Sequence, residues 1–207
     1  MGGKRSRQNI FRRVKQPVSK YMSLALAGSL LTLGLILQGN TMDLNYAYLL
    51  DTIAQGESRG NYNAYYGNVR NTQVDFTAMT VGEVLAWQDE QVASGSPSSA
   101  VGKYQFINTT LRGLVDEMDV SHEARFDARL QDKLAIRLLE RRGVREYAKG
   151  QITREQLAHN LSKEWAALPR VLGGNPDASY YDGDGLNRAH VNTEQILAAI
   201  ASLKKQG

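Results

Sequence analysis

The 207-residue sequence contains no cysteine, and this absence excludes several kinds of chemistry at once. Without thiols the chain cannot form disulfides, use a cysteine nucleophile or hold a metal through cysteine ligands. Histidine is nearly as scarce. His122, His159 and His190 lie far apart, and none belongs to an HExxH or His-x-His arrangement. We therefore expect neither a metal site nor a cofactor.

Two other motifs are missing or incomplete. No GxSxG turn is present that could carry a serine nucleophile. The segment Asp182-Gly-Asp184-Gly resembles the start of a calcium loop, but its twelfth position is Thr193 rather than glutamate, which favours a plain turn. The chemistry that remains is acid–base catalysis by carboxyl groups beside aromatic and amide side chains, a combination that suits sugar recognition.

Acidic residues are absent before Asp43, whereas residues 1–20 hold seven cations. The rest of the chain has 18 cations against 21 acidic residues, so it is mildly acidic although the formal charge of the whole chain is +4. The basic isoelectric point therefore gives no support for nucleic-acid binding, and we expect none.

A charge-free stretch follows the basic N-terminus. Within it, residues 24–37 (LALAGSLLTLGLIL) are apolar apart from small and hydroxyl-bearing residues, and ~20 helical residues cross a bilayer core. We predict a basic cytoplasmic tail over 1–20, a transmembrane or signal-anchor helix over 21–38 and a catalytic domain over 39–207 in the periplasm. A cleaved signal peptide and a buried core helix remain alternatives. Because glycine, serine and threonine dilute the segment, we also expect that it can later leave the inner membrane.

Apolar periodicity and capping signals predict a mainly helical body with irregular segments between the helices. Residues 58–77 are polar, aromatic and rich in glycine and asparagine, which indicates a loop with a short hairpin. The expected helices run from about Asp43 to Gly56, from the capping box Thr80-x-x-Glu83, over a short segment near 111–118, from about Glu123 to Arg142, from the capping box Thr153-x-x-Gln156, and from a cap at Thr193.

The apolar face of the first of these helices leads to a glutamate. The face is formed by Tyr46, Leu49, Leu50, Ile53 and Ala54, and the next position on it is Glu57. A carboxyl group at the edge of an apolar face loses hydration, which raises its pKa and lets it keep a proton near neutral pH, as a general acid must. The alternative is a glutamate that forms a salt bridge with Arg59 at the helix end.

Four motifs in order make the chain resemble a known family. They are ESRGNYNAYYG (57–67), SSAVGKYQFI (98–107), LSKEWAALP (161–169) and SYYDGDGLN (179–187). Together they resemble the lysozyme-like muramidases of the bacteriophage lambda endolysin type, over nearly the whole body from Asp43 to Leu203. That resemblance implies an α+β lysozyme-like fold, mainly helical with a small β-hairpin lobe, and an enzyme that cleaves peptidoglycan. We expect the protein to be a monomer.

The resemblance also implies roles for individual residues. It makes Glu57 the catalytic acid, and it implies that the substrate is bound by Ser58, Tyr104, Gln105, Tyr180, Tyr181 and Asn187. In the lambda type a glycine usually follows the acid, whereas Ser58-Arg59-Gly60 follows here, as in the wider lytic transglycosylases.

The number of catalytic carboxylates separates the possible reactions. A hydrolytic lysozyme needs a second carboxylate as nucleophile or base, whereas a transglycosylase can work with one. Asp75 is the one candidate we retain, because Glu83 lies in a capping box and Asp89 and Glu90 lie on the polar face of a helix. We therefore predict a membrane-tethered lytic transglycosylase, from a phage or a wall-opening system. The alternatives are a hydrolytic lysozyme and a non-catalytic glycan-binding envelope protein.

Overall fold

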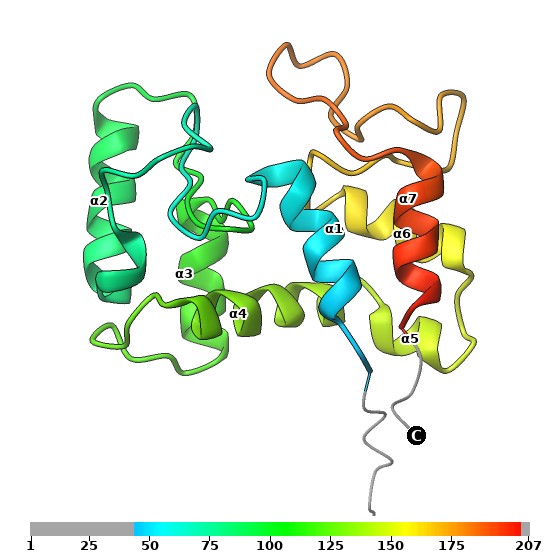
Figure 1. Ribbon diagram of the computed structural model, residues 1–207, viewed down its shortest axis with the longest axis horizontal. Helices are drawn as coiled ribbons and strands as arrows, with labels where there is room; N and C mark the ends of the chain where they lie inside the picture. Colours follow the sequence, from blue (N-terminus) through cyan, green and yellow to red (C-terminus); the bar gives the residue numbers. More distant parts are fainter. Residues whose placement is uncertain (1–43, 204–207) are drawn as a thin grey trace, which may run out of the picture. The chain divides into compact units, whose positions relative to one another are not determined.

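The computed structural model describes residues 44–203, which form a mainly helical body (Figure 1). The helices are α1 (Ala47–Glu57), the 3-10 helix η1 (Phe76–Ala78), α2 (Val81–Ala93), α3 (Asn108–Glu117), α4 (Ala128–Arg141), α5 (Val144–Ala148), α6 (Arg154–Ser162) and α7 (Thr193–Ala201). The mainly helical prediction is confirmed. Within residues 44–203 there is no extended strand, and the expected hairpin is reduced to isolated bridges such as those from Tyr65 to Asn68 and to Val101.

Local capping chemistry sets the ends of most helices. The predicted capping boxes at the starts of α2 and α6 are both present. Reciprocal hydrogen bonds join Thr80 and Glu83 in the first and Thr153 and Gln156 in the second. The cap of α7 is Asn192 rather than the predicted Thr193, because the Asn192 side chain accepts the backbone N–H of Gln195. The prediction was wrong by one residue there.

Helix α4 begins at Ala128, about five residues later than predicted. Asp127 caps it by accepting the backbone N–H of Leu130. The residues before Asp127 are held instead by the segment at the start of α2: Phe126 donates its backbone N–H to Met79, and Ala124 accepts that of Val81. Tertiary pairing therefore overrides the helical periodicity of this stretch.

Helix α1 carries the predicted apolar face into the core. Leu49 and Ile53 are fully buried, and burial of such a side chain stabilises the fold by about 1.5–3 kcal/mol. The helix starts at Ala47, whose backbone N–H is accepted by the side chain of Asn45, a few residues later than predicted. The predicted cap, Asp43, lies outside the described residues. Its C-terminal residue is Glu57, as the apolar stripe indicated.

Two groups of helices pack around α1. Helix α2 packs against α3, whereas α1 contacts both α4 and α7, and α7 packs against α6. Figure 1 shows α2 and α3 on one side of α1, α6 and α7 on the other, and α4 running below. A single cluster of buried apolar residues connects all of them. Because α1 stands between the two groups, its last residue lies where segments from both can meet.

No helix within residues 44–203 is both long and apolar enough to cross a membrane. The predicted tail over 1–20 and the predicted membrane segment over 21–38 lie outside the described residues.

Candidate active site

Glu57 is partly buried at the C-terminal end of α1. Its Oε1 accepts a hydrogen bond of 3.0 Å from the backbone N–H of Ala167. Loss of hydration raises the pKa of Glu57 from 4.5 to about 7, although the Ala167 N–H, which favours the charged form, lowers it in part. The carboxyl group can therefore hold a proton near neutral pH. The alternative of a salt bridge to Arg59 is not seen in the structure, where no ion pair within 4 Å joins these two described residues.

The Ala167 peptide is fixed from three sides. Its carbonyl oxygen accepts the backbone N–H groups of His190 (2.8 Å) and Val191 (3.1 Å). Its methyl group packs on Gly56, where an added Cβ would lie only 2.9 Å from Ala167 Cβ and 3.0 Å from a Val191 methyl carbon. Glycine at position 56 thus lets the 166–167 segment approach α1 closely enough to bind Glu57.

Two adjoining pockets meet at Glu57 and together form a groove. One, about 410 Å³, is lined by Arg59, Val69, Arg188 and His190, and we call it the arginine pocket. The other, about 630 Å³, is lined by Tyr66, Ile107, Glu164, Trp165 and Tyr181, and we call it the aromatic pocket. Both share Glu57, Ala166, Leu186 and Asn187. An elongated substrate that fills both pockets would therefore cross Glu57 and extend from it in both directions.

The described residues form no cluster of three or more His, Asp or Glu side chains that could hold a metal ion.

Three of the six predicted substrate-binding residues lie in the groove. Gln105 and Tyr181 line the aromatic pocket, and Asn187 lines both pockets. Gln105 has a positive φ of 50°, which is uncommon for a residue with a Cβ and is typical of functional sites. Its side chain is held by a hydrogen bond from Nε2 to the carbonyl oxygen of Gly102.

The other three predicted residues lie away from the groove walls. Ser58 is fully buried, and its hydroxyl donates to the carbonyl oxygens of Lys103 (2.7 Å) and Ala54 (3.3 Å). Tyr104 is buried and lines a smaller side cavity of about 210 Å³ that adjoins the aromatic pocket. Tyr180 is exposed and packs edge-on against Tyr181. The structure thus gives the side chains of Ser58 and Tyr104 structural contacts, and neither side chain lines the two pockets that meet at Glu57.

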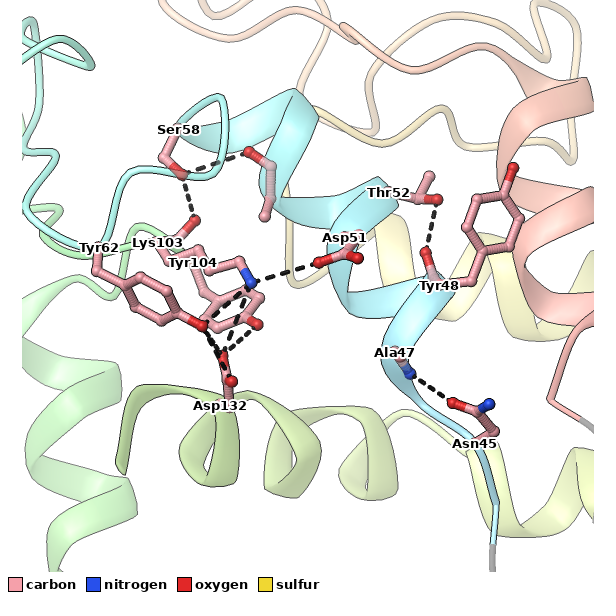
Figure 2. Close-up of polar contacts among 11 residues, drawn as sticks. Asn45, Ala47, Tyr48, Asp51, Thr52, Ser58, Tyr62, Lys103, Tyr104 and Asp132 are labelled. Atoms are coloured by element: carbon pink, nitrogen blue, oxygen red, sulfur yellow. Dashed lines mark hydrogen bonds and ion pairs between the residues drawn. The ribbon is translucent and has the colours of Figure 1, made fainter. Parts of the chain in front are cut away.

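Ser58 and Tyr104 belong to a polar network around Lys103 (Figure 2). The Lys103 ammonium lies 3.2 Å from the Tyr62 hydroxyl, 3.4 Å from Asp51 and 3.9 Å from Asp132. Burial by itself would lower the pKa of Lys103, but the Tyr62 hydroxyl and the two carboxylates outweigh it and raise the pKa. Lysine is therefore charged here, and it links α1, α4 and the 101–106 turn next to Glu57.

Asp75, the predicted second carboxylate, is exposed and lines neither pocket. It accepts hydrogen bonds from Thr77 (2.6 Å) and Asn63 (3.2 Å), and these bonds lower its pKa. These hydrogen bonds indicate that the Asp75 carboxylate stabilises the conformation of its own loop. The structure does not bring Asp75 together with Glu57.

The sequence analysis missed a different carboxylate in the groove. Glu164 lines the aromatic pocket together with Glu57, and its side chain is 13% exposed. It is bound to Arg142, whose Nε donates to it at 2.8 Å. The available signal was its position directly before Trp165 in the LSKEWAALP motif.

A partly buried carboxyl group that can hold a proton near neutral pH, at the junction of two pockets, is suited to general acid catalysis on a chain-like substrate. The comparison with family models makes this specific: the family model described as Endolysin matches residues 47–189, more than half of the chain. The chain belongs to the endolysin family, the phage enzymes that degrade peptidoglycan. No curated protein and no solved structure matches the chain.

Proposed function

We propose that the protein cleaves the β-1,4 bond between N-acetylmuramic acid and N-acetylglucosamine as a lytic transglycosylase, with Glu57 as its only catalytic carboxyl group. The observation that carries this proposal is the raised pKa of Glu57, about 7, at the junction of two pockets. It is supported by the position of Asp75 outside the groove and by the pairing of Glu164 with Arg142.

The proposed reaction uses one carboxyl group twice, first as an acid and then as a base. Because the Ala167 N–H binds Oε1, the proton of Glu57 is carried by Oε2 and passes to the glycosidic oxygen as the bond from that oxygen to C1 breaks. The C6 hydroxyl of the same muramic acid then attacks C1 and gives its proton to the Glu57 carboxylate. The ring closes to a 1,6-anhydro sugar, the acid is regenerated, and no water is consumed.

The second candidate is a hydrolytic lysozyme on the same groove. One observation favours it: Glu164 shares the aromatic pocket with Glu57. A carboxylate there could act as base for an attacking water, which is the second role that hydrolysis requires. Its ion pair with Arg142 would have to open for that role, which is why we place this reaction second.

Mass spectrometry of digested sacculi distinguishes the two reactions. Detergent-solubilised full-length protein is incubated with sacculi in water enriched in ¹⁸O. A transglycosylase yields anhydro ends without label, whereas a hydrolase yields reducing ends that carry one ¹⁸O.

Two isosteric variants assign the carboxylates in the same assay. Glu57→Gln should lower cleavage by at least about 10³-fold, since glutamine cannot donate the proton. Glu164→Gln is the matched control, and it should retain cleavage and the anhydro product. Near-normal cleavage by a folded Glu57→Gln protein would overturn the assignment of the acid. Labelled reducing ends from the wild type, together with loss of cleavage in Glu164→Gln, would favour the hydrolase.

A further inference from the structure

The two halves of the groove differ in charge. The arginine pocket contains Arg59 and Arg188, and its only acidic residue is Glu57. The aromatic pocket contains no arginine or lysine, and its second acid, Glu164, is neutralised by Arg142. A glycan lying across Glu57 would therefore meet positive charge on one side of the cleaved bond only.

The two arginines in the pocket have no acidic partner. Among residues 44–203, six other arginines form ion pairs with acidic side chains, namely Arg112, Arg137, Arg141, Arg142, Arg145 and Arg154. Arg59 and Arg188 are exposed and form none within 4 Å. Their guanidinium groups thus keep their hydrogen-bond donors for a ligand.

The backbone at Arg59 gives independent support. Arg59 directly follows the residue that caps α1, and its φ of 56° is left-handed. Glycine is the usual residue at this position, because a Cβ makes the conformation unfavourable. The chain nevertheless has arginine there, followed by Gly60, so the side chain at 59 is kept against a local cost, as is common at binding sites.

The loop that carries Arg188 is organised in a way that leaves the arginine available. Asp184 is the acid closest before it in the chain, and its carboxylate accepts the backbone N–H groups of Leu186 and Asn187, both at 2.8 Å, and the Asn187 side chain at 2.6 Å. Asp184 is thus engaged within its own turn, and that turn sets Asn187 and Arg188 on the pocket wall.

We infer that the arginine pocket binds carboxylates of the peptide stem that the muramic acid unit on that side of the cleaved bond carries. This inference rests on the proposed function. The N-acetylated sugars of such a strand are neutral, so the anionic groups beside the glycan belong to the stem. Guanidinium groups bind carboxylates through paired N–H···O bonds, which is why two unpaired arginines suit this ligand.

The experiment changes only the charge of the stem. Sacculi are treated with a carbodiimide and excess methylamine, which converts stem carboxylates to neutral amides and leaves the glycan unchanged. Initial rates of cleavage are measured on native and amidated sacculi with the full-length wild type, the double variant Arg59→Gln/Arg188→Gln and a charge-matched control, Arg70→Gln/Arg129→Gln. The control residues are exposed, unpaired and outside both pockets.

The readout is the ratio of the native rate to the amidated rate. We expect a ratio of about five to ten for the wild type and for the control variant. The ratio should fall toward one in the double variant, and it should also fall toward one for the wild type when the assay is run at high salt. Equal wild-type rates on both substrates, or a double variant that keeps the wild-type ratio, would overturn the inference. Failure of the proposed function looks different: either no cleavage of native sacculi by the wild type or labelled reducing ends in place of anhydro ends.

Discussion

The backbone N–H of Ala167 and the carboxyl group of Glu57, 110 residues apart in the chain, are joined by a hydrogen bond of 3.0 Å. This contact holds the 166–167 segment against the end of α1 and orients the acid. It also moderates the pKa of Glu57, because the N–H favours the charged form while burial favours the neutral one. The balance places the pKa of Glu57 at about 7.

The dependence of rate on pH should report the titration of Glu57. The acid must be protonated to donate, so kcat/KM should be nearly constant below the pKa of about 7 and fall about tenfold per pH unit above it. The measurement is initial turbidity clearing of permeabilised cells between pH 5 and 9. A rate that already falls about tenfold per pH unit from pH 5 upward, or that shows no fall up to pH 9, would show that Glu57 does not act as a buried acid.

Stability should change with pH in the direction that the raised pKa of Glu57 sets. Between about pH 4.5 and 7 the folded protein keeps a proton on Glu57 that the unfolded chain has released, so this group's contribution to the free energy of unfolding falls as pH rises. Glu57→Gln does not titrate. We expect it to be more stable than the wild type by roughly 1–3 kcal/mol at pH 8 and about equal at pH 4. Urea unfolding at both pH values tests this prediction. If the free energy of unfolding differs between the variant and the wild type by the same amount at pH 4 and pH 8, the prediction is wrong.

Gly56→Ala should separate Glu57 from Ala167. The added methyl group would lie 2.9 Å from Ala167 Cβ, so the 166–167 segment must shift, at a net cost of about 1–3 kcal/mol. Activity should fall at least tenfold, and the pH at which the remaining activity is lost should rise, because the N–H that lowers the pKa of Glu57 has moved away.

The control for this variant is Gly113→Ala in α3, where no heavy atom lies within 4 Å of the added Cβ. It should gain up to about 1 kcal/mol of stability with unchanged activity. If Gly56→Ala keeps the rate and pH profile of the wild type, the close packing at Gly56 is not what positions the acid.

The predicted membrane segment over 21–38 can be tested by cell fractionation. We propose that it tethers the enzyme and later leaves the bilayer, because its small and hydroxyl-bearing residues lower the cost of extraction, at about 0.8 kcal/mol per buried CH₂. Replacing Gly28, Ser29, Thr32 and Gly34 with leucine should hold the protein in the membrane fraction and delay lysis. The same four replaced with alanine should still be released at full length. If the wild-type protein is found only as a shortened form, or only in the membrane fraction, the proposed release of the full-length protein is wrong.

Features set by neighbours in the sequence were predictable. The capping boxes at Thr80 and Thr153 and the apolar face that ends in Glu57 depend on residues three or four positions apart, and all three are present in the structure. Motif resemblance pointed to Gln105, Tyr181 and Asn187, which the structure places on the groove wall; that they bind substrate stays a prediction.

Features set by distant contacts were not predictable. The partner of Glu57 is a backbone N–H, which every residue but proline possesses, so no sequence signal marks Ala167. Ser58 and Tyr104 lie in the right motifs, but whether a side chain turns to the groove or to the Lys103 network depends on packing. Glu164 was overlooked because an acid in a helix-end motif looks like surface until the 105–107 turn is brought beside it.

The 110-residue separation of Glu57 and Ala167 has a consequence for the cell that makes the protein. During synthesis the acid leaves the ribosome long before its partner segment exists. Until that segment folds back, Glu57 is hydrated and deprotonated at neutral pH, and it cannot donate a proton. If Glu57 is the catalytic acid, as we propose, unfinished or prematurely terminated chains should not cleave the wall, and activity should appear only in molecules whose second half has been completed and docked.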